Sequence, residues 1–387
     1  MSAHFTAAPR RVCFVTGTRA EFGLMRSTLV AIKGHPKLRL QLIVTGMHLD
    51  RSRGRSLDAI RAEGWTVDAV IPWAKGDGSP TAAAGAMGKA TASLAKTFAA
   101  LNSEIVLVVG DRVEAFAAAS AAHVSNRLVA HVHGGDRALG LVDDSLRHAI
   151  TKLAHIHFPA TQLSAQRIKK MGEDSWRIVR AGSPGLDAIR TDAAPRTTLA
   201  REFPGLGPRT YALLLLHPQS PDPSREGQSA KLLLKCVEAI GFQHVLIVYP
   251  NNDPGAQGIA SYWDELAPSN RRIIRRDLPR ELFLGLMRDA AILVGNSSSG
   301  IIEAASFGAP VLDIGDRQAG RERGTNVAHA QFNESSIQNA LKRIWRSGNP
   351  IRFPAKNGYG SGGAGQKIAS TLAEIKTPRF LRKLIAY

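Results

Sequence analysis

The apolar residues of the chain come in short runs of valine, isoleucine and leucine, separated by longer stretches with helical periodicity or high alanine content. In the first half, this pattern predicts strands at residues 12–16, 40–44, 69–71, 105–109 and 128–131, and helices at residues 21–32, 81–101, 113–124 and 144–155. Continuous apolar runs are typical of parallel strands buried on both faces. The alternation therefore predicts a doubly wound parallel sheet.

The same alternation returns in the second half after an interruption. Residues 183–185 and 204–208 contain the proline and glycine that break regular structure. The pattern then predicts strands at residues 211–216, 244–249, 273–274, 291–294 and 310–314, and helices at residues 228–240, 280–288 and 366–375.

The length of the chain fits two domains, because 387 residues are more than one hydrophobic core usually serves. We predict an α/β fold with two Rossmann-like doubly wound domains that face each other across a cleft. Residues 1–183 would form the first domain and residues 184–365 the second. A C-terminal helix within residues 366–387 would pack back on the first domain.

Charge narrows the classes of function. The chain has 50 Lys and Arg against 32 Asp and Glu, and the formal net charge of +18 attracts phosphate-bearing partners over long range. Nucleic-acid binding is disfavoured, because only 6% of the residues are aromatic, no base-stacking motif is present and the basic residues are scattered. We therefore predict no nucleic-acid partner.

Other compositional features exclude several kinds of site. Cys13 and Cys236 are the only cysteines, which excludes a disulfide framework and a cysteine-built metal site. No His, Asp and Glu cluster has a recognised metal-ligand spacing, so we expect no metal. The first eleven residues lack a signal-peptide core, and no window approaches about 18 uninterrupted apolar residues. We expect a cytoplasmic protein without stable membrane insertion.

Ligands of open parallel sheets bind beyond the carboxyl ends of the strands, so the residues that follow each predicted strand are candidates for function. After the first strand, residues 17–23 form a Gly-Thr turn that leads into a helix, whose free N–H groups and dipole can meet a phosphate. Arg19 can add a charge-assisted hydrogen bond to that phosphate. Glu21 is a further candidate for substrate or nucleotide binding. The alternative is a structural connector.

Ionisable residues follow two further strands. Asp111 comes directly after residues 105–109, and His133 and Asp136 come after residues 128–131. An aspartate in this place can act as a base or orient a cation, and a histidine titrates near neutral pH. In the alternative, the aspartate caps a helix and the histidines are satisfied within the loop.

Two adjacent carboxylates open the helix that follows. Asp143 and Asp144 lie at its start, and Arg147 lies one turn further on. Neighbouring carboxylates can have their pKa values pushed apart, so that one donates a proton and the other accepts one. The alternative is an acidic first turn that complements the helix dipole.

The second half carries a set of polar residues that suits a nucleoside diphosphate. Small hydroxyl residues and glycine at a helix start can surround phosphates, arginines can neutralise them, and a glutamate one turn later can accept from ribose hydroxyls. The members are His217, Asn296, Ser297, Ser298, Ser299, Gly300, Glu303, Arg317 and Arg321. The alternative is a serine-rich helix cap without a ligand.

Several of these stretches together resemble a known family. The most specific are residues 15–23 (VTGTRAEFG), 110–112 (GDR), 131–135 (HVHGG), 144–152 (DSLRHAITK), 295–300 (GNSSSG) and 314–318 (IGDRQ). Because these stretches occur in this order along the sequence, the chain resembles the UDP-N-acetylglucosamine 2-epimerase family over nearly its whole length. The Gly-Asp-Arg and Asp-Asp-Ser-x-Arg-His stretches favour the hydrolysing branch, which releases N-acetylmannosamine for sialic-acid-type sugars.

The resemblance implies a chemistry and roles for residues. A base removes the C2 proton, UDP leaves C1 to give a 2-acetamidoglucal, and water adds with inversion at C2. Asp111, Asp143 or Asp144 would handle protons, and Arg147 would hold their geometry. The residues that would hold the nucleotide are Arg19, His217, Ser297, Ser298, Glu303 and Arg317. The resemblance also implies a homodimer or homotetramer and no cofactor.

One position departs from the family pattern. Members with the His-x-His-Gly-Gly stretch usually continue with Glu, whereas this chain has Asp136. Its side chain is shorter by about 1.5 Å, and a misplacement of 1 Å can cost on the order of 100-fold in rate. Either a water or a shifted loop compensates, or the substrate is a modified sugar. His133 could also supply the proton transfer that other branches assign to a carboxylate.

Three other functions stay open on the sequence alone. A non-hydrolysing epimerase would keep the glucal and UDP bound and return UDP-N-acetylmannosamine. A hydrolysing enzyme could instead act on a sugar modified at C4 or C6, or on a GDP-linked sugar. A nucleotide-sugar glycosyltransferase would share the fold, but it needs at most one base, whereas the first domain offers several carboxylates.

Overall fold

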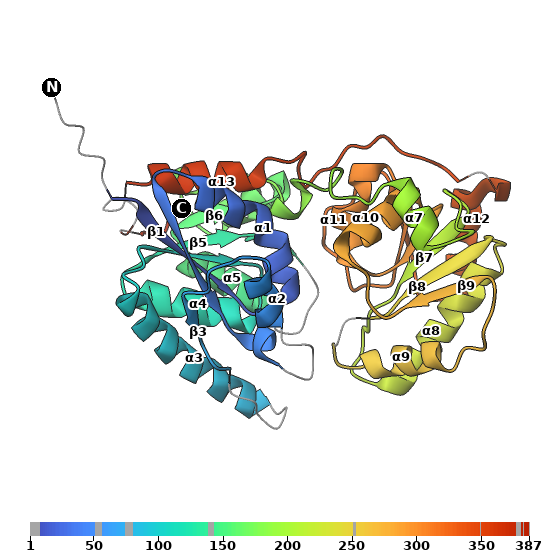
Figure 1. Cartoon of the computed structure of the whole chain (residues 1–387), viewed down its shortest axis with the longest axis horizontal. Coiled ribbons are helices and arrows are strands. Elements are labelled where there is room, and N and C mark those ends of the chain that lie inside the picture. Colours follow the sequence, from blue (N-terminus) through green and yellow to red (C-terminus); the bar gives the residue numbers. More distant parts are fainter. Residues whose placement is uncertain are drawn as a thin grey trace. The chain divides into compact units, whose positions relative to one another are not determined.

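The computed structural model describes residues 8–50, 56–73, 80–137, 143–250, 253–348, 350–376, 381 and 383–386. The chain divides into two compact units. Unit 1 comprises Met1–Asp187 with Gly362–Tyr387, and unit 2 comprises Ala188–Ser361. The chain therefore leaves unit 1 after Asp187 and returns to it at Gly362 (Figure 1).

Unit 1 is built on a six-stranded sheet in the order β3-β2-β1-β4-β5-β6. Its strands are β1 (Arg10–Thr16), β2 (Leu38–Val44), β3 (Ala69–Val70), β4 (Ile105–Val109), β5 (Leu128–Val132) and β6 (Ile156–Phe158). All neighbouring strands are parallel. Their carboxyl ends therefore meet at one edge of the sheet, which gathers the loops that follow them.

Alternate residues of β1 point to opposite faces of this sheet, and each face is covered by helices. Val12 and Phe14 pack with α1 (Arg19–Gly34), α2 (Ser56–Ala62) and α13 (Ala364–Glu374). Cys13 and Val15 pack with α3 (Pro80–Ala100), α4 (Val113–Val124) and α5 (Asp143–Leu153). Helix α6 (Gln162–Lys170) follows β6. Both faces are buried, as the continuous apolar runs predicted.

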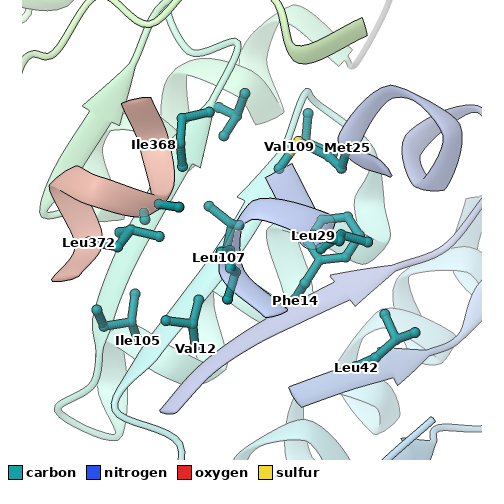
Figure 2. Packing of buried hydrophobic residues seen from close by; sticks show 14 of the residues in the cluster. Val12, Phe14, Met25, Leu29, Leu42, Ile105, Leu107, Val109, Ile368 and Leu372 are labelled. Carbon is teal, nitrogen blue, oxygen red and sulfur yellow. The ribbon is translucent and has the colours of Figure 1, made fainter. Parts of the chain in front are cut away.

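Helix α13, although it lies near the C-terminus, belongs to the core of unit 1. Ile368 and Leu372 of α13 lie in the same apolar cluster as Val12 and Leu107 of the sheet (Figure 2). The carboxylate of Asp187 accepts hydrogen bonds from the backbone N–H groups of Ala364 (2.8 Å) and Gly365 (2.7 Å), which caps the start of α13. Residues about 180 positions apart are thus joined in one layer.

Unit 2 repeats the architecture with a parallel sheet in the order β12-β11-β10-β7-β8-β9. Its strands are β7 (Tyr211–Leu215), β8 (His244–Val248), β9 (Arg272–Arg275), β10 (Ile292–Gly295), β11 (Val311–Ile314) and β12 (Val327–Ala330). Its helices are α7 (Arg196–Glu202), α8 (Pro223–Glu238), α9 (Ala256–Asp264), α10 (Arg280–Asp289), α11 (Ser298–Ile302) and α12 (Glu334–Trp345). Helices α8, α9 and α12 pack on one face, and α7 and α10 on the other.

The fold class predicted from the sequence is confirmed: both units are doubly wound parallel sheets. Each strand and helix predicted from periodicity is present, with ends that differ by a few residues. The pattern missed strands β6 and β12 and helices α2, α6, α7, α9 and α12. The start of α11 was expected from the serine-rich stretch at residues 297–300. Among the residues described, no helix combines the length and the apolar character that a membrane span requires.

Candidate active-site residues at the strand ends

The loop between β1 and α1 is held by a reciprocal capping arrangement. The hydroxyl of Thr18 accepts from the backbone N–H of Glu21 (3.2 Å), and the Glu21 carboxylate accepts from the N–H groups of Gly17 (2.8 Å) and Thr18 (3.0 Å). Burial, with the nearby Glu114 carboxylate, raises the pKa of Glu21 to about 7. The Glu21 carboxylate thus serves the loop itself. Arg19, the first residue of α1, is exposed to solvent.

The first carboxylate–arginine pair joins two strand-end loops. Arg147 is 3% exposed and forms an ion pair through Nη2 with Asp111, which follows β4. One turn before Arg147 on α5, Asp144 places its carboxylate 3.9 Å from Arg147 Nη1 and 3.4 Å from His148 Nε2. The side chains of Asp111 and Asp144 stay 25% and 30% exposed, so a ligand can reach both. Asp143 is the first residue of α5, and its side chain lies outside the described part.

His131 has a structural place in this group. Its Nε2 lies 2.8 Å from the carbonyl oxygen of Gly110, and its Nδ1 lies 3.3 Å from Oγ1 of Thr151. Complete burial lowers the pKa of His131 to about 3, which keeps the ring neutral. The hydroxyl of Thr151 in turn donates to the carbonyl of Arg147 (3.0 Å). His131 therefore ties the loop after β4 to the helix that carries Arg147.

His133 and Asp136 form the second candidate pair. Nδ1 of His133 lies 2.9 Å from Oδ2 of Asp136, and Nε2 lies 3.0 Å from the hydroxyl of Ser183. The other oxygen of Asp136 accepts from the hydroxyl of Ser164 (2.7 Å). His133 and Asp136 are 6% and 5% exposed. Both carboxylate oxygens of Asp136 are thus engaged by protein groups, and one of them orients the imidazole.

The backbone around His133 is strained and closely packed. His133 has a φ of +62°, a left-handed conformation that costs non-glycine residues on the order of 1–3 kcal/mol. Gly135 follows with a φ of +74°, and a Cβ there would overlap the carbonyl of Ser164. A Cβ on Gly134 would come within 2.8 Å of the His131 ring. The two glycines are needed because α6 and His131 approach this loop so closely.

In unit 2, Asn296 joins three strand-end loops. Its side chain accepts from the N–H of His217 (2.8 Å) and donates to the carbonyl of the same residue (2.8 Å), so it pairs with the backbone after β7. Its own carbonyl accepts from Gln318 Nε2 (3.0 Å) and Arg317 Nη1 (3.3 Å) of the loop after β11. Asn296 is fully buried, which favours a positioning role, while the His217 side chain is half-buried.

The other predicted residues of unit 2 lie beside this junction. Ser297 caps α11 and shares a hydrogen bond with the hydroxyl of Ser299 (2.9 Å). Ser298 and Gly300 lie within α11. Glu303 ends α11, and its carboxylate pairs with Arg280 (3.0 Å), although burial raises its pKa.

Two arginines of the loop after β11 complete the set. Arg317 pairs with Asp253 at 3.1 Å and is 26% exposed. Arg321 donates from its backbone N–H to the carbonyl of Gln318. This backbone hydrogen bond forms a turn within the loop that carries both arginines, next to Asn296.

Several contributors were missed by sequence reasoning. Ser164 and Ser183 contact Asp136 and His133, but neither directly follows a predicted strand. Arg280 opens α10 and pairs with Glu303 across 23 positions of sequence. The only available signal was the proline directly before Arg280, at the N-cap of α10, and it marks the helix start but not the pairing with Glu303.

Comparison with known proteins identifies what the chain is similar to. Residues 30–373 match the family model of UDP-N-acetylglucosamine 2-epimerase. A UDP-N-acetylglucosamine 2-epimerase of Neisseria meningitidis serogroup B is 34% identical over 95% of this chain and 94% of its own length. A UDP-N,N'-diacetylbacillosamine 2-epimerase (hydrolyzing) of Legionella pneumophila is 33% identical over 98% of this chain and 100% of its own.

A solved structure supports the fold. The structure of the UDP-GlcNAc 2-epimerase from Neisseria meningitidis bound to UDP-GlcNAc superposes with a TM-score of 0.80. The match covers 94% of this chain and 100% of that chain at 19% identity, so it bears on the fold alone.

Proposed function

This chain belongs to the UDP-N-acetylglucosamine 2-epimerase family, and we propose that it is a hydrolysing member that converts UDP-N-acetylglucosamine and water to N-acetylmannosamine and UDP. The observation that carries the proposal is the pairing of His133 with Asp136 at the end of β5 (2.9 Å). A neutral imidazole oriented by a carboxylate can take a proton from water and give one back. The hydrolytic half of the reaction needs such a group.

The first step is an elimination. A carboxylate takes the C2 proton, the C2–H electron pair forms the C1=C2 double bond, and UDP leaves C1 with the electrons of the C1–O bond. Asp111 and Asp144 are the described candidates for the base, because both are partly exposed and both are held beside Arg147.

The second step returns a proton and adds water. The 2-acetamidoglucal receives a proton at C2 on the face opposite to the one that lost it, and a hydroxyl from water at C1. His133 suits this step, since its Nε2 can accept the proton that water loses by way of the Ser183 hydroxyl, which lies 3.0 Å from it. A carboxylic acid among Asp111, Asp143 and Asp144 would supply the proton at C2. Loss of the free sugar then completes hydrolysis.

Unit 2 would hold the nucleotide. The hydroxyls of Ser297 and Ser298 and the half-buried His217 offer donors to the diphosphate, and Arg317 offers a positive charge. Glu303 is placed one turn later and can accept from ribose hydroxyls. Arg19 of unit 1 is an exposed cation at a helix start and suits a phosphate as well.

A second candidate differs only in the sugar. The Legionella relative named for UDP-N,N'-diacetylbacillosamine is as similar as the Neisseria relative, at 33% against 34% identity. A hydrolysing epimerase on this 4-substituted sugar would use the same residues of unit 1. The loop with Asp136 in place of the usual Glu is the first place to look for the difference.

Proton NMR in deuterated water decides between these functions. The protein is incubated separately with UDP-N-acetylglucosamine and with UDP-N,N'-diacetylbacillosamine. Free UDP together with a free 2-epimeric sugar deuterated at C2 supports hydrolytic epimerisation, and the faster substrate is the one assigned. Accumulation of a UDP-linked epimer deuterated at C2 would assign the non-hydrolysing reaction instead, and unchanged spectra with both sugars would reject the proposal.

A matched pair of variants links the result to the site. Asp111→Asn removes the carboxylate just beyond the carboxyl end of β4. Glu104→Gln removes one at the amino end of the same strand, where it pairs with Arg11 at 3.3 Å and is 38% exposed. We expect Asp111→Asn to lower kcat by on the order of 100-fold or more and Glu104→Gln to leave it unchanged. Equal activities for the two would remove Asp111 from the mechanism.

A further inference from the structure

Ser183 makes an unusual hydrogen bond for its position. It stands at the N-cap of a short 3₁₀ turn, Pro184–Leu186, where a serine commonly accepts a hydrogen bond from a backbone N–H. Here the side chain makes no capping bond, and Oγ lies 3.0 Å from Nε2 of His133. Ser183 is 1% exposed, so this hydroxyl is committed to the inside of unit 1.

The neighbouring groups fix the direction of the bond. An ionised carboxylate has only acceptor atoms, so Asp136 accepts from Nδ1–H of His133 (2.9 Å). Ser164 donates to the other oxygen of Asp136 (2.7 Å), which holds the carboxylate in place. With its proton on Nδ1, the neutral imidazole presents a lone pair at Nε2. The hydroxyl of Ser183 is therefore the donor to Nε2.

The Ser183 loop is itself held by two helices of unit 1. The hydroxyl of Ser27 on α1 donates to the carbonyl of Pro184 (3.1 Å). The backbone N–H of Leu186 donates to the carbonyl of Ser183 (3.0 Å). Asp187, next in the chain, caps α13. The Ser183 hydroxyl thus contacts His133 from a loop whose backbone is held in place. Only the O–H bond of Ser183 remains free to rotate.

We propose that Ser183, together with Asp136, keeps His133 in the Nδ1–H tautomer while the ring is neutral and in one ring orientation in both of its protonation states. The proposal rests on the role given above to His133. The hydroxyl donates to the single lone pair of Nε2 while the ring is neutral. When it passes its proton to Nε2 and takes another from water, it becomes the acceptor of Nε2–H. Asp136 keeps its bond to Nδ1–H in both states, so the ring takes and returns a proton without losing either partner.

This arrangement explains why the position needs a hydroxyl. An alanine would leave Nε2 without a partner inside the protein, and an amide could not change from donor to acceptor at one atom. A threonine keeps the hydroxyl and adds a methyl group. The expected order of function is therefore serine, then threonine, then alanine.

The direct test is the ¹⁵N spectrum of the full chain labelled in its histidines. The chain has 12 histidines, so the His133 signals are identified by their loss in His133→Gln. We expect a protonated Nδ1 and a bare, hydrogen-bonded Nε2. In Ser183→Ala, the Nε2 signal should move toward that of a nitrogen that accepts no hydrogen bond. A wild-type ring protonated at Nε2, or an unchanged Nε2 signal in Ser183→Ala, would overturn the proposal.

Kinetics give the second test, with Ser27→Ala as the matched control. Ser27→Ala removes a hydroxyl that holds the same loop but does not touch the imidazole. We expect Ser183→Ala to lower kcat on the order of 10- to 100-fold with little change in KM, and Ser183→Thr to restore most of it. A kcat for Ser183→Ala equal to that of Ser27→Ala would contradict the proposal.

The two proposals fail in different ways. The spectrum is recorded without substrate, so it reports on Ser183 and His133 even if neither sugar nucleotide is turned over. Inactivity on both substrates with the expected spectrum removes the proposed function and keeps the positioning of His133. Full activity with the wrong tautomer keeps the function and removes the role of Ser183.

Discussion

The buried carboxylate of Glu173 should make unit 1 sensitive to acid in a defined pH range. Its side chain is fully buried and accepts from Lys152 (2.6 Å), Lys383 (2.8 Å) and His157 (3.1 Å). Burial raises the pKa of Glu173, but the hydrogen bonds from His157, Lys152 and Lys383 together outweigh it and hold the pKa at about 2. The ordinary value is 4.5, so the native state favours the ionised form.

The sign and size of the effect follow from this difference. A group with a lowered native pKa stabilises the protein above its unfolded pKa and loses that contribution as the pH falls toward the native value. The fall from 4.5 to about 2 corresponds to about 3 kcal/mol, present at neutral pH and lost between about pH 4.5 and pH 2. Removal of the charge also leaves two ammonium groups facing each other without a counter-charge.

Glu173→Gln measures this contribution. We expect a loss of about 3 to 5 kcal/mol in the free energy of unfolding at pH 7, because a buried charge pair loses one partner. The loss should shrink as the pH falls from 4.5 toward 2. Two-domain chains can unfold one domain at a time. Hydrogen exchange of the β5 and β6 amides therefore measures the stability of unit 1 separately from that of unit 2. The control is Glu104→Gln, an exposed ion pair worth about 0–1 kcal/mol.

The difference between variant and wild type isolates Glu173 from the other acid-sensitive groups. Burial lowers the pKa of His48 to about 4 and that of His131 to about 3. Both rings are protonated at a higher pH in the unfolded chain, so both also reduce stability as the pH falls below about 6.5. Both histidines are present in the variant and in the wild type, so their contributions cancel in the difference between the two free energies of unfolding. A Glu173→Gln penalty that stays constant from pH 7 to pH 2.5 would refute the reasoning.

Three further substitutions test the site. Arg147→Lys should lower kcat by about 100-fold or more, since an ammonium cannot hold Asp111 with the planar guanidinium geometry, and steady-state kinetics will show it. Gly135→Ala should reduce the free energy of unfolding by about 2–4 kcal/mol in urea titrations, because its Cβ overlaps the Ser164 carbonyl at a φ of +74°. Asp136→Glu should lower kcat by about 10- to 100-fold, because the longer side chain must fit where both oxygens already have partners, and an unchanged or higher kcat would show that the loop adapts.

The sheets were predictable because their signal is local. Strands such as β4 (Ile105–Val109) are fully buried on both faces, and only a run of apolar residues satisfies that environment. Strand β6 (Ile156–Phe158) was missed because it has three residues and a histidine in the middle. His157 is buried there because Glu173 accepts from its ring, and Glu173 is itself placed by two lysines. Periodicity within a short window contains none of these contacts.

The candidate residues show the same limit for chemistry. The spacing after each strand located Asp111, His133 and Asp136 at one edge of a sheet, since parallel strands bring their carboxyl ends together. It could not tell which atoms each side chain contacts. Asp136 was expected to matter for its reach toward a sugar, yet its two oxygens lie on His133 and Ser164. The bond from Ser183 joins residues 50 positions apart, and no local pattern specifies such a pairing. Because the partner of a buried polar group is chosen by the whole fold, the structure was needed to distinguish a carboxylate that orients an imidazole from one that meets the substrate.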